Sequence, residues 1–230
     1  MRYKNIFFDL DDTIWAFSKN ARDTFEEVYC ANHFDRFFDS FDHFYTLYEQ
    51  KNVELWSEYG EGKISKDELN SMRFFYPLQS VGIHDEALAK RYSADFFSII
   101  PTKSGLMPHA KEVLEYLAPR YNLYILSNGF RELQWRKMCA SGVDGYFKKL
   151  ILSEDLGVMK PWPEIFHFAL SATQSGLRDS LMIGDSWEAD ITGAKGVGMH
   201  QVFYNVTGRT EFPFHPTYHI RSLKDLINLL

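Results

Sequence analysis

The chain has 230 residues, of which 45% are hydrophobic and 24% are charged, and its formal net charge is −6. This length and apolar content allow a well-buried core, either in one domain or in one domain with an insertion. The negative charge argues against a large basic surface for duplex nucleic acid or an anionic membrane, but a local basic pocket could still bind a small anion.

Cysteine usage and hydropathy indicate where the protein works. Cys30 and Cys139 lie far apart and outside any metal-binding spacing, which favours free thiols in a reducing compartment. The N-terminus shows no signal peptide, and no apolar run approaches the ~20 residues of a membrane span. We therefore expect a cytoplasmic protein that binds neither membrane nor nucleic acid. The sequence does not indicate an oligomeric state.

The first predicted element is a short buried strand, Asn5–Phe8, which ends at Asp9. The following segment, residues 17–98, has apolar residues three and four apart, a spacing typical of amphipathic helices. Within it, Ser65 and Glu68 fit a capping box at the start of a helix. No strand pattern interrupts this segment, so we expect an all-helical domain.

Beyond residue 98, predicted strands and helices alternate. We expect strands at YNLYILSN, KKLILS, SLMIGD and MHQVFY, and helices at residues 108–118, 130–141 and 161–173, from Trp187, and in the closing SLKDLINLL. We interpret FPFHPTYH, before the last helix, as a loop. The alternation predicts an α/β fold with a doubly wound, Rossmann-like parallel sheet formed by residues 1–16 and 99–230. The helical domain would then be a cap inserted after the first strand.

Polar side chains follow the predicted strands at the points where these end. They are Asp9 and Asp11 after the first strand, Ser127 and Asn128 after the second, Lys160 in a later loop, and Asp185 with Asp190 after SLMIG. In a doubly wound sheet such residues converge on one crevice at the switch point, where the first strand should lie. Clustered carboxylates need a cation to offset them, and an all-oxygen ligand set favours Mg²⁺ beside a phosphate. The sequence thus predicts a site for Mg²⁺ and a phosphate.

These residues resemble the motifs of the haloacid dehalogenase superfamily of Mg²⁺-dependent phosphohydrolases with a helical cap. The matching stretches are DLDDT (Asp9–Thr13), the serine of YILSNG, the lysine of VMKPWPEIF and the acid pair of GDSWEAD, and the resemblance covers essentially the whole chain. It implies that Asp9 is a nucleophile that forms an aspartyl-phosphate. It also implies that Asp11 is the general acid for the leaving oxygen and then the base for water, roles that suit two neighbouring carboxyl groups.

The same resemblance implies how the phosphoryl group is bound. Ser127 and Lys160 would contact its oxygens, with Asn128 as a further contact. An ammonium near Asp9 would also keep that carboxylate ionised. The expected catalytic set is therefore Asp9, Asp11, Ser127 and Lys160.

The metal site that the resemblance implies uses three of the acidic residues as ligands. Asp9 and Asp185 would bind Mg²⁺ directly, and Asp11 would bind it through its backbone carbonyl. Asp190 would support these ligands without binding the ion itself. Asp12, between the two catalytic aspartates, is interpreted as a solvated or turn-stabilising residue.

Substrate choice is expected to depend on the cap. The stretch NVELWSEYGEGKIS, together with Leu69 and Arg73, resembles the branch of pyrimidine nucleotidases that cleave nucleoside 5′-monophosphates. We therefore expect a small phosphorylated metabolite, a nucleoside monophosphate, as substrate. The candidate substrate-binding residues are Trp15, Phe17, Asn52, Trp56 and Arg73.

Two alternatives to a 5′-nucleotidase stay open from the sequence. One is a phosphatase that acts on sugar phosphates or other small metabolites. The other is a non-catalytic protein of the same fold that binds a phospholigand. The acid at Asp11 favours phosphate ester chemistry, because the dehalogenases of the superfamily lack an acid at that position.

Overall fold

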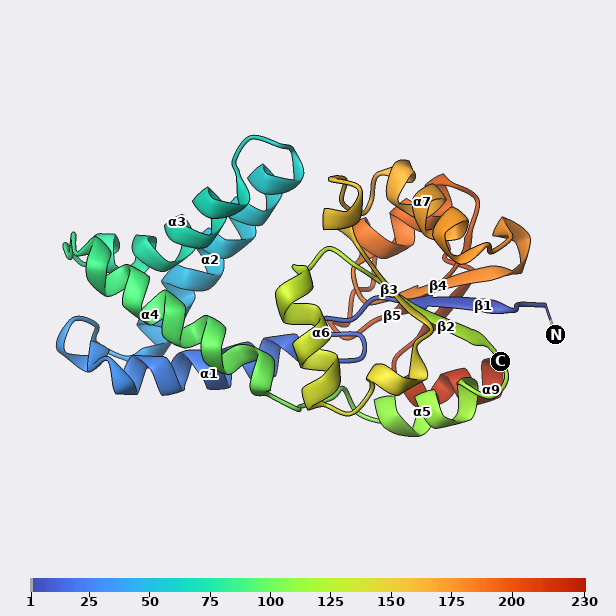
Figure 1. The fold of residues 1–230 in the computed structure, drawn as a ribbon, viewed down its shortest axis with the longest axis horizontal. Helices are drawn as coiled ribbons and strands as arrows, with labels where there is room; N and C mark the ends of the chain where they lie inside the picture. The colour runs from blue at the N-terminus through green and yellow to red at the C-terminus, as the bar shows by residue number, and fades with distance from the viewer. Residues whose placement is uncertain (1) are drawn as a thin grey trace. The chain divides into compact units, whose positions relative to one another are not determined.

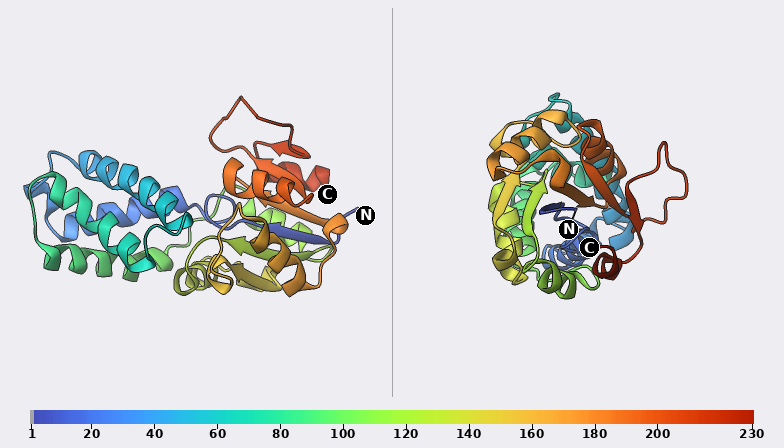
Figure 2. Two further views of the ribbon diagram at one scale, coloured as in Figure 1. Left: turned by 90° about the horizontal axis from the view of Figure 1, so that it is seen from above. Right: turned by 90° about the vertical axis from the view of Figure 1, so that its right-hand side faces the viewer.

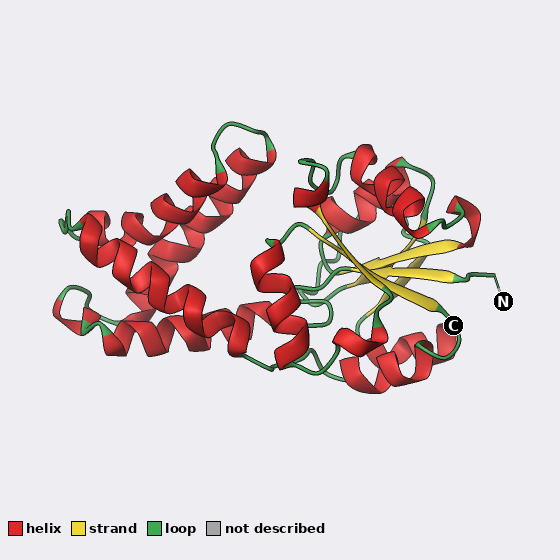
Figure 3. Cartoon of the chain, in the orientation of Figure 1, coloured by secondary structure: helices red, strands yellow, loops and turns green. Residues whose placement is uncertain are grey.

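The computed structural model describes residues 2–230, and the chain divides into two compact units. One unit is Met1–Ser18 with Lys103–Leu230, and the other is Lys19–Thr102. The first unit contains the β-sheet, whereas the second consists of helices and loops (Figures 1 and 3). None of the described helices is long and apolar enough to cross a membrane.

The helical unit is built from amphipathic helices, three of which begin at a side-chain N-cap. Its elements are α1 (Phe17–Ala31), η1 (Phe34–Arg36), α2 (Phe41–Gly60), α3 (Lys66–Ser80), α4 (Glu86–Ile99) and η2 (Ile100–Thr102). The capping box predicted for α3 is present. The Glu68 N–H donates to Ser65 Oγ at 3.2 Å, and the Ser65 N–H donates back to Glu68 Oε2 at 2.8 Å.

Aromatic rings fill the interior of this unit. The Phe25 side chain of α1 is fully buried, and its ring centroid lies 4.0 Å from that of Tyr48 and 4.2 Å from that of Phe96. Phe44 and Phe74 lie against the same ring, with centroids 5.9 and 6.1 Å away. Apolar residues spaced three and four apart therefore bring rings from four helices together around Phe25.

The other unit contains one six-stranded parallel sheet, which confirms the predicted α/β fold. Its strands are β1 (Asn5–Phe8), β2 (Asn122–Ser127), β3 (Lys149–Leu152), β4 (Ser180–Gly184), β5 (His200–Tyr204) and β6 (Tyr218–Ile220). Their order in the sheet is β3-β2-β1-β4-β5-β6. β1 lies between β2 and β4, so its carboxyl end lies at the point where the strand order reverses.

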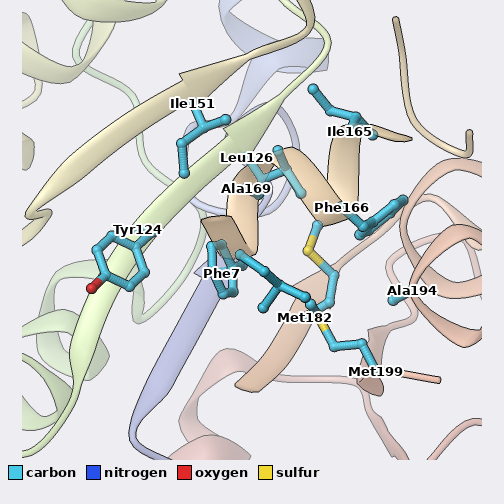
Figure 4. Close-up of a cluster of buried hydrophobic side chains, with 11 residues drawn as sticks. Phe7, Tyr124, Leu126, Ile151, Ile165, Phe166, Ala169, Met182, Ala194 and Met199 are labelled. Atoms are coloured by element: carbon cyan, nitrogen blue, oxygen red, sulfur yellow. The ribbon is translucent and has the colours of Figure 1, made fainter. Parts of the chain in front are cut away.

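Helices cover both faces of the sheet. They are α5 (Ala110–Leu117), α6 (Arg131–Ala140), α7 (Pro163–Thr173), α8 (Gly193–Gly196) and α9 (Leu226–Leu229). α7 lies on one face of the strands, and α5 with α9 lies on the other (Figure 1). On the α7 face, Phe7, Tyr124 and Met182 of the strands pack with Ile165 and Phe166 of α7 (Figure 4).

The end of the chain differs from the sequence prediction in one strand. We predicted a loop for FPFHPTYH, which is wrong for its last two residues, because Tyr218 and His219 belong to β6 and pair with β5. A three-residue edge strand is too short to show an alternating pattern, so composition alone favoured a loop. The connection from β5 to β6 projects as a long loop in both views of Figure 2.

The helix predicted from Trp187 also has a different form. It begins as a π-helix, η6 (Trp187–Thr192), and continues as the short α8. The Ile191 N–H donates to the Ser186 carbonyl, five residues back, at 3.3 Å. Such wider turns occur often at functional sites, and this one carries Asp190.

The chain leaves and re-enters the sheet-containing unit through two paired segments. The Met107 N–H donates to the Ile14 carbonyl at 2.9 Å, and the Ala16 N–H donates to the Gly105 carbonyl at 3.1 Å. These bonds lie on both sides of a bridge between Trp15 and Leu106. The start and end of the insertion are therefore fastened to each other within the sheet-containing unit.

The aromatic core predicts the effect of truncating its central ring. Phe25→Ala should lower the free energy of unfolding by about 3–5 kcal/mol, since it leaves a cavity among four helices. Urea denaturation followed by circular dichroism would measure the loss. Val53→Ala, at a side chain that is 67% exposed on α2, is the control and should cost well under about 1 kcal/mol. Equal losses in the two variants would contradict the proposed core.

Candidate active site

Asp9 is positioned by the strand that precedes it. Its N–H donates to the Ile183 carbonyl at 2.9 Å, so the pairing of β1 with β4 extends to Asp9. The chain then turns tightly, because the N–H groups of Ile14 and Trp15 both donate to the Leu10 carbonyl, at 2.9 and 2.8 Å. The turn places Asp11 close to Asp9 at the carboxyl end of the sheet.

Asp12 has a structural role at this turn. It has a positive φ of 57°, and its carboxylate accepts hydrogen bonds from the N–H and the hydroxyl of Ser18, at 2.9 and 2.5 Å. It thereby caps the first turn of α1, where backbone N–H groups have no helical partner.

Lys160 is the centre of the acidic cluster. Its ammonium donates to Asp9 Oδ1 at 2.6 Å, to Asp190 Oδ1 at 2.7 Å and to the Leu126 carbonyl at 2.7 Å. These bonds use all three protons of the ammonium. Lys160 is 4% exposed and Asp190 is fully buried, so the ion pairs are shielded from water.

Asn128 holds the backbone of Lys160 in place. Its side-chain amide donates to the Lys160 carbonyl at 3.0 Å, and its side-chain oxygen accepts from the Lys160 N–H at 2.8 Å. The phosphate contact that the sequence predicts for Asn128 stays a prediction; its side chain binds the backbone of Lys160.

A second pair of contacts fixes the loop after β4. Thr13 Oγ1 donates to Asp185 Oδ1 at 3.0 Å and accepts from the Asp185 N–H at 3.1 Å. Asp190 Oδ2 accepts from the Ser186 N–H at 3.1 Å. A Cβ atom at Gly184 would lie 2.1 Å from Asp190 Oδ2, so only glycine leaves room for this carboxylate.

Oxygen atoms of Asp9, Asp185 and Asp190 all lie within 4.8 Å of one another. Three carboxylates beside one ammonium leave an excess of negative charge, and the donor set consists of oxygen alone, so the group fits a hard divalent cation such as Mg²⁺. The expected ligands Asp9 and Asp185 are both in this group, and Asp190, expected to support them without binding the ion, lies with them. The expected metal contact from the Asp11 backbone carbonyl stays a prediction.

Burial and mutual repulsion change the proton affinities of these groups. Burial raises the pKa of Asp9 well above its usual range, opposed by Lys160 and reinforced by Asp190 and Asp185. Burial, with repulsion from Asp190, raises the pKa of Asp185 to about 7. Burial alone would lower the pKa of Lys160, but Asp190 and Asp9 raise it above its ordinary value, so Lys160 stays protonated.

Ser127 ends β2 and is 2% exposed. Its Oγ accepts hydrogen bonds from the Gly129 N–H at 3.1 Å and from Gln134 Nε2 at 2.8 Å. With two bonds accepted, the hydroxyl has its own proton to donate, and this suits contact with a phosphoryl oxygen.

Two residues of the site were missed in the sequence. Lys137 Nζ donates to Asp11 Oδ1 at 2.8 Å, and Gln134 Nε2 donates to Asp11 Oδ2 at 2.8 Å. Both come from α6, where they are buried three residues apart. One feature of the sequence could have indicated them. Gln134 and Lys137 follow the serine motif closely, and their spacing of three puts them on one face of the predicted helix.

The candidate substrate-binding residues lie in two places. In the sheet-containing unit, Trp15 is fully buried and its indole N–H donates to the Lys103 carbonyl at 3.1 Å, while Phe17 is partly exposed. In the helical unit, the Arg73 guanidinium donates to Asn52 Oδ1 at 3.4 Å, and the Trp56 ring packs on Tyr59. Arg73 Nε has no hydrogen-bond partner among the described residues. Their contacts with a substrate stay predictions.

Comparison with known proteins gives one family. The model of the haloacid dehalogenase-like hydrolases matches residues 3–198. The HAD-hydrolase YfnB of Bacillus subtilis is 30% identical over all of this chain and 96% of its own length. Its crystal structure with bound magnesium, which reveals interdomain movement, aligns with a TM-score of 0.86 at 28% identity and covers 100% of this chain and 99% of that one.

Named phosphatases are also similar to this chain. Pyrimidine 5′-nucleotidase PynA of Streptococcus pneumoniae is 31% identical over all of this chain and 96% of its own length. Glyceraldehyde 3-phosphate phosphatase of Pyrococcus abyssi is 34% identical over 87% of this chain and 81% of its own length. The relatives thus share phosphate ester hydrolysis and differ in substrate.

The raised pKa of Asp185 predicts a pH-dependent stability of the metal-free protein. Its pKa is higher in the folded state than in the unfolded chain, so its contribution to stability is present below about pH 4 and is lost as the pH rises through about 7. In EDTA at pH 8, Asp185→Asn should therefore be more stable than wild type by about 1–3 kcal/mol, with a smaller difference at pH 5. Urea denaturation at both pH values would measure this.

Magnesium should reverse the order of the two proteins. Mg²⁺ is expected to stabilise the wild type by binding the folded state and to have little effect on Asp185→Asn. Glu164→Gln, at an exposed acid of α7, is the control and should behave like wild type. An Asp185→Asn protein that is less stable than wild type at pH 8 in EDTA would refute this view of the cluster.

Proposed function

The chain belongs to the haloacid dehalogenase-like hydrolases and is a phosphatase, and from this we propose that it hydrolyses pyrimidine nucleoside 5′-monophosphates with Mg²⁺, through an aspartyl-phosphate at Asp9. The observation that carries the proposed chemistry is the Lys160 ammonium 2.6 Å from Asp9 Oδ1, within the carboxylate cluster. This contact favours the ionised form of Asp9 against the burial that raises its pKa, and it fixes the orientation of the carboxylate, as a nucleophile requires.

The first half of the proposed reaction transfers the phosphoryl group to Asp9. Lys160 holds Oδ1, so attack on phosphorus would come from Oδ2. The leaving oxygen takes a proton from Asp11, and the Ser127 hydroxyl donates a hydrogen bond to a phosphoryl oxygen. Asp9 and Asp185 would hold Mg²⁺. When bound, the ion would offset charge on the phosphoryl group.

The second half releases phosphate. Asp11, now ionised, accepts a proton from water as the water attacks the phosphorus of the aspartyl-phosphate. The P–O bond to Asp9 breaks and the nucleophile is regenerated. One carboxyl group therefore serves as acid and then as base, and the proton count balances over the cycle.

The nucleotide substrate is supported by two observations. PynA, named a pyrimidine 5′-nucleotidase, is similar over the whole chain, and the helical unit has two partly exposed aromatic rings, Trp56 and Tyr59, that pack on each other. A base that stacks on an aromatic ring gains ~1–3 kcal/mol. The substrate-binding residues proposed from the sequence are Asn52, Trp56 and Arg73 of the helical unit and Trp15 and Phe17 of the sheet-containing unit.

A second candidate substrate class is supported by another relative. The similarity to the glyceraldehyde 3-phosphate phosphatase, at 34% identity, favours a small sugar phosphate. Both candidates use the same catalytic residues, so the choice between them is a matter of kcat/KM and not of mechanism.

A substrate panel decides between the two classes. We expect UMP, dUMP and dTMP to show kcat/KM values at least about 10-fold above those of glyceraldehyde 3-phosphate and glucose 6-phosphate, since base stacking adds ~1–3 kcal/mol. Phosphate release would be measured with Mg²⁺, and AMP would serve as the purine control. Equal or better turnover of the sugar phosphates would defeat the nucleotidase proposal.

The mechanism predicts that Asp9 and the metal are both indispensable. Asp9→Asn should lower kcat by at least about 10³-fold, because an amide is a poor nucleophile, and EDTA should remove the activity of the wild type until Mg²⁺ is restored. The control is Asp12→Asn, which can still cap α1 and should keep most activity. An Asp9→Asn enzyme that is as active as Asp12→Asn would exclude the aspartyl-phosphate mechanism.

A further inference from the structure

Two buried polar side chains of α6 contact the same carboxylate. Lys137 and Gln134 are three residues apart, so they lie on one face of the helix. Lys137 donates to one oxygen of Asp11 and Gln134 to the other, each at 2.8 Å. A carboxylate that accepts one bond on each oxygen cannot rotate without breaking one of them.

Lys137 is an unusual residue to bury in a helix face. It is 3% exposed, whereas the Asp11 side chain that pairs with it is 27% exposed. Its ammonium lies 4.6 Å from the centre of the Trp15 ring and 5.2 Å from that of Phe17, where the rings attract a cation. Ion pairs of this kind rarely add more stability than apolar packing, so stability alone does not explain the choice of lysine.

Gln134 connects Asp11 to Ser127. Its Nε2 atom donates to Asp11 Oδ2 and to Ser127 Oγ, both at 2.8 Å, while its Oε1 atom is buried without a hydrogen-bond partner among the described residues. The opposite amide orientation would place an oxygen against the carboxylate and repel it. The observed orientation makes two hydrogen bonds and leaves the amide oxygen unsatisfied. Proteins seldom leave a buried polar atom unsatisfied without a functional reason.

We propose that Gln134 and Lys137 are positioning residues for Asp11. They hold its carboxyl group at a fixed place beside Ser127, so that it meets the leaving oxygen when the phosphoryl group is bound. Each carboxylate oxygen has a second lone pair, so the bonds from α6 leave a position for the transferred proton. This inference rests on the role of Asp11 in the proposed function.

The proposal predicts a dependence on the leaving group. An alkyl phosphate such as UMP has a poor leaving oxygen that needs a proton from Asp11, whereas the phenolate of 2,4-dinitrophenyl phosphate leaves without one. The ratio kcat/KM covers only the steps up to the first irreversible one, which here is phosphorylation of Asp9. The later role of Asp11 as a base therefore does not enter this ratio.

The central experiment compares Lys137→Met with wild type on both esters. We expect kcat/KM to fall by about 10²-fold for the best alkyl ester of the panel, the order of one general acid contribution, and by less than about threefold for 2,4-dinitrophenyl phosphate. Retained hydrolysis of the dinitrophenyl ester also shows that the variant is folded. Equal losses on the two esters would overturn the proposal, as would no loss on either.

Three further variants sharpen the comparison. Lys137→Arg keeps the charge and should recover part of the alkyl ester activity. Gln134→Met keeps the length without the donor and should show the same leaving-group dependence as Lys137→Met. Arg136→Met removes an exposed cation of α6 and should match wild type on both esters. If Lys137→Met is insoluble, the Arg and Gln134 variants carry the test by the same criterion.

Asp11→Asn separates failure of this inference from failure of the proposed function. If Asp11→Asn loses activity equally on both esters, the general acid assignment itself is wrong. If Asp11→Asn shows the leaving-group dependence and the α6 variants do not, only the positioning role is wrong. When Lys137 acts through Asp11, adding Lys137→Met to Asp11→Asn should change kcat/KM for the alkyl ester less than about threefold.

Discussion

The contact on which the site depends is the Lys160 ammonium shared by Asp9, Asp190 and the Leu126 carbonyl. It joins the ends of β1 and β2 to the π-helix that follows β4, so one cation ties three parts of the chain together. Removal of either charge would leave a buried group unpaired, which is costly. The Asp190 carboxylate occupies the space that a Cβ atom at the end of β4 would need, so this strand ends in glycine. Local sequence, backbone geometry and electrostatics therefore support the same arrangement.

Much of this arrangement could be predicted because it follows from where strands end. β1 has the bounds that its short apolar run predicts, and it lies at the switch point, where the sequence predicts the first strand. Parallel strands bring their carboxyl ends to one edge, so the amino-acid sequence alone is enough to expect Asp9 and Asp185 together. The α/β fold class could likewise be predicted, because the alternation of predicted strands and helices is enough to assign it.

The parts that could not be predicted depend on contacts across the fold. Gln134 and Lys137 look like ordinary polar residues of a surface helix, and only the packing of α6 shows that they are buried beside Asp11. β6 is an edge strand of three residues without periodicity, so its pairing with β5 decides its conformation. The engagement of the Asn128 side chain with the backbone of Lys160 is another such case, because the two residues are 32 positions apart.

The paired segments around the Trp15–Leu106 bridge have a consequence for how such a protein can change over time. The chain leaves and re-enters the sheet-containing unit at two segments that are hydrogen-bonded to each other. These bonds do not depend on the residues inserted between the two segments. An insertion of different length or sequence could be joined at the same two points while the acidic cluster keeps its supports. The insertion and the residues at the strand ends could then evolve independently, the first by exchange of the whole segment and the second by slow change.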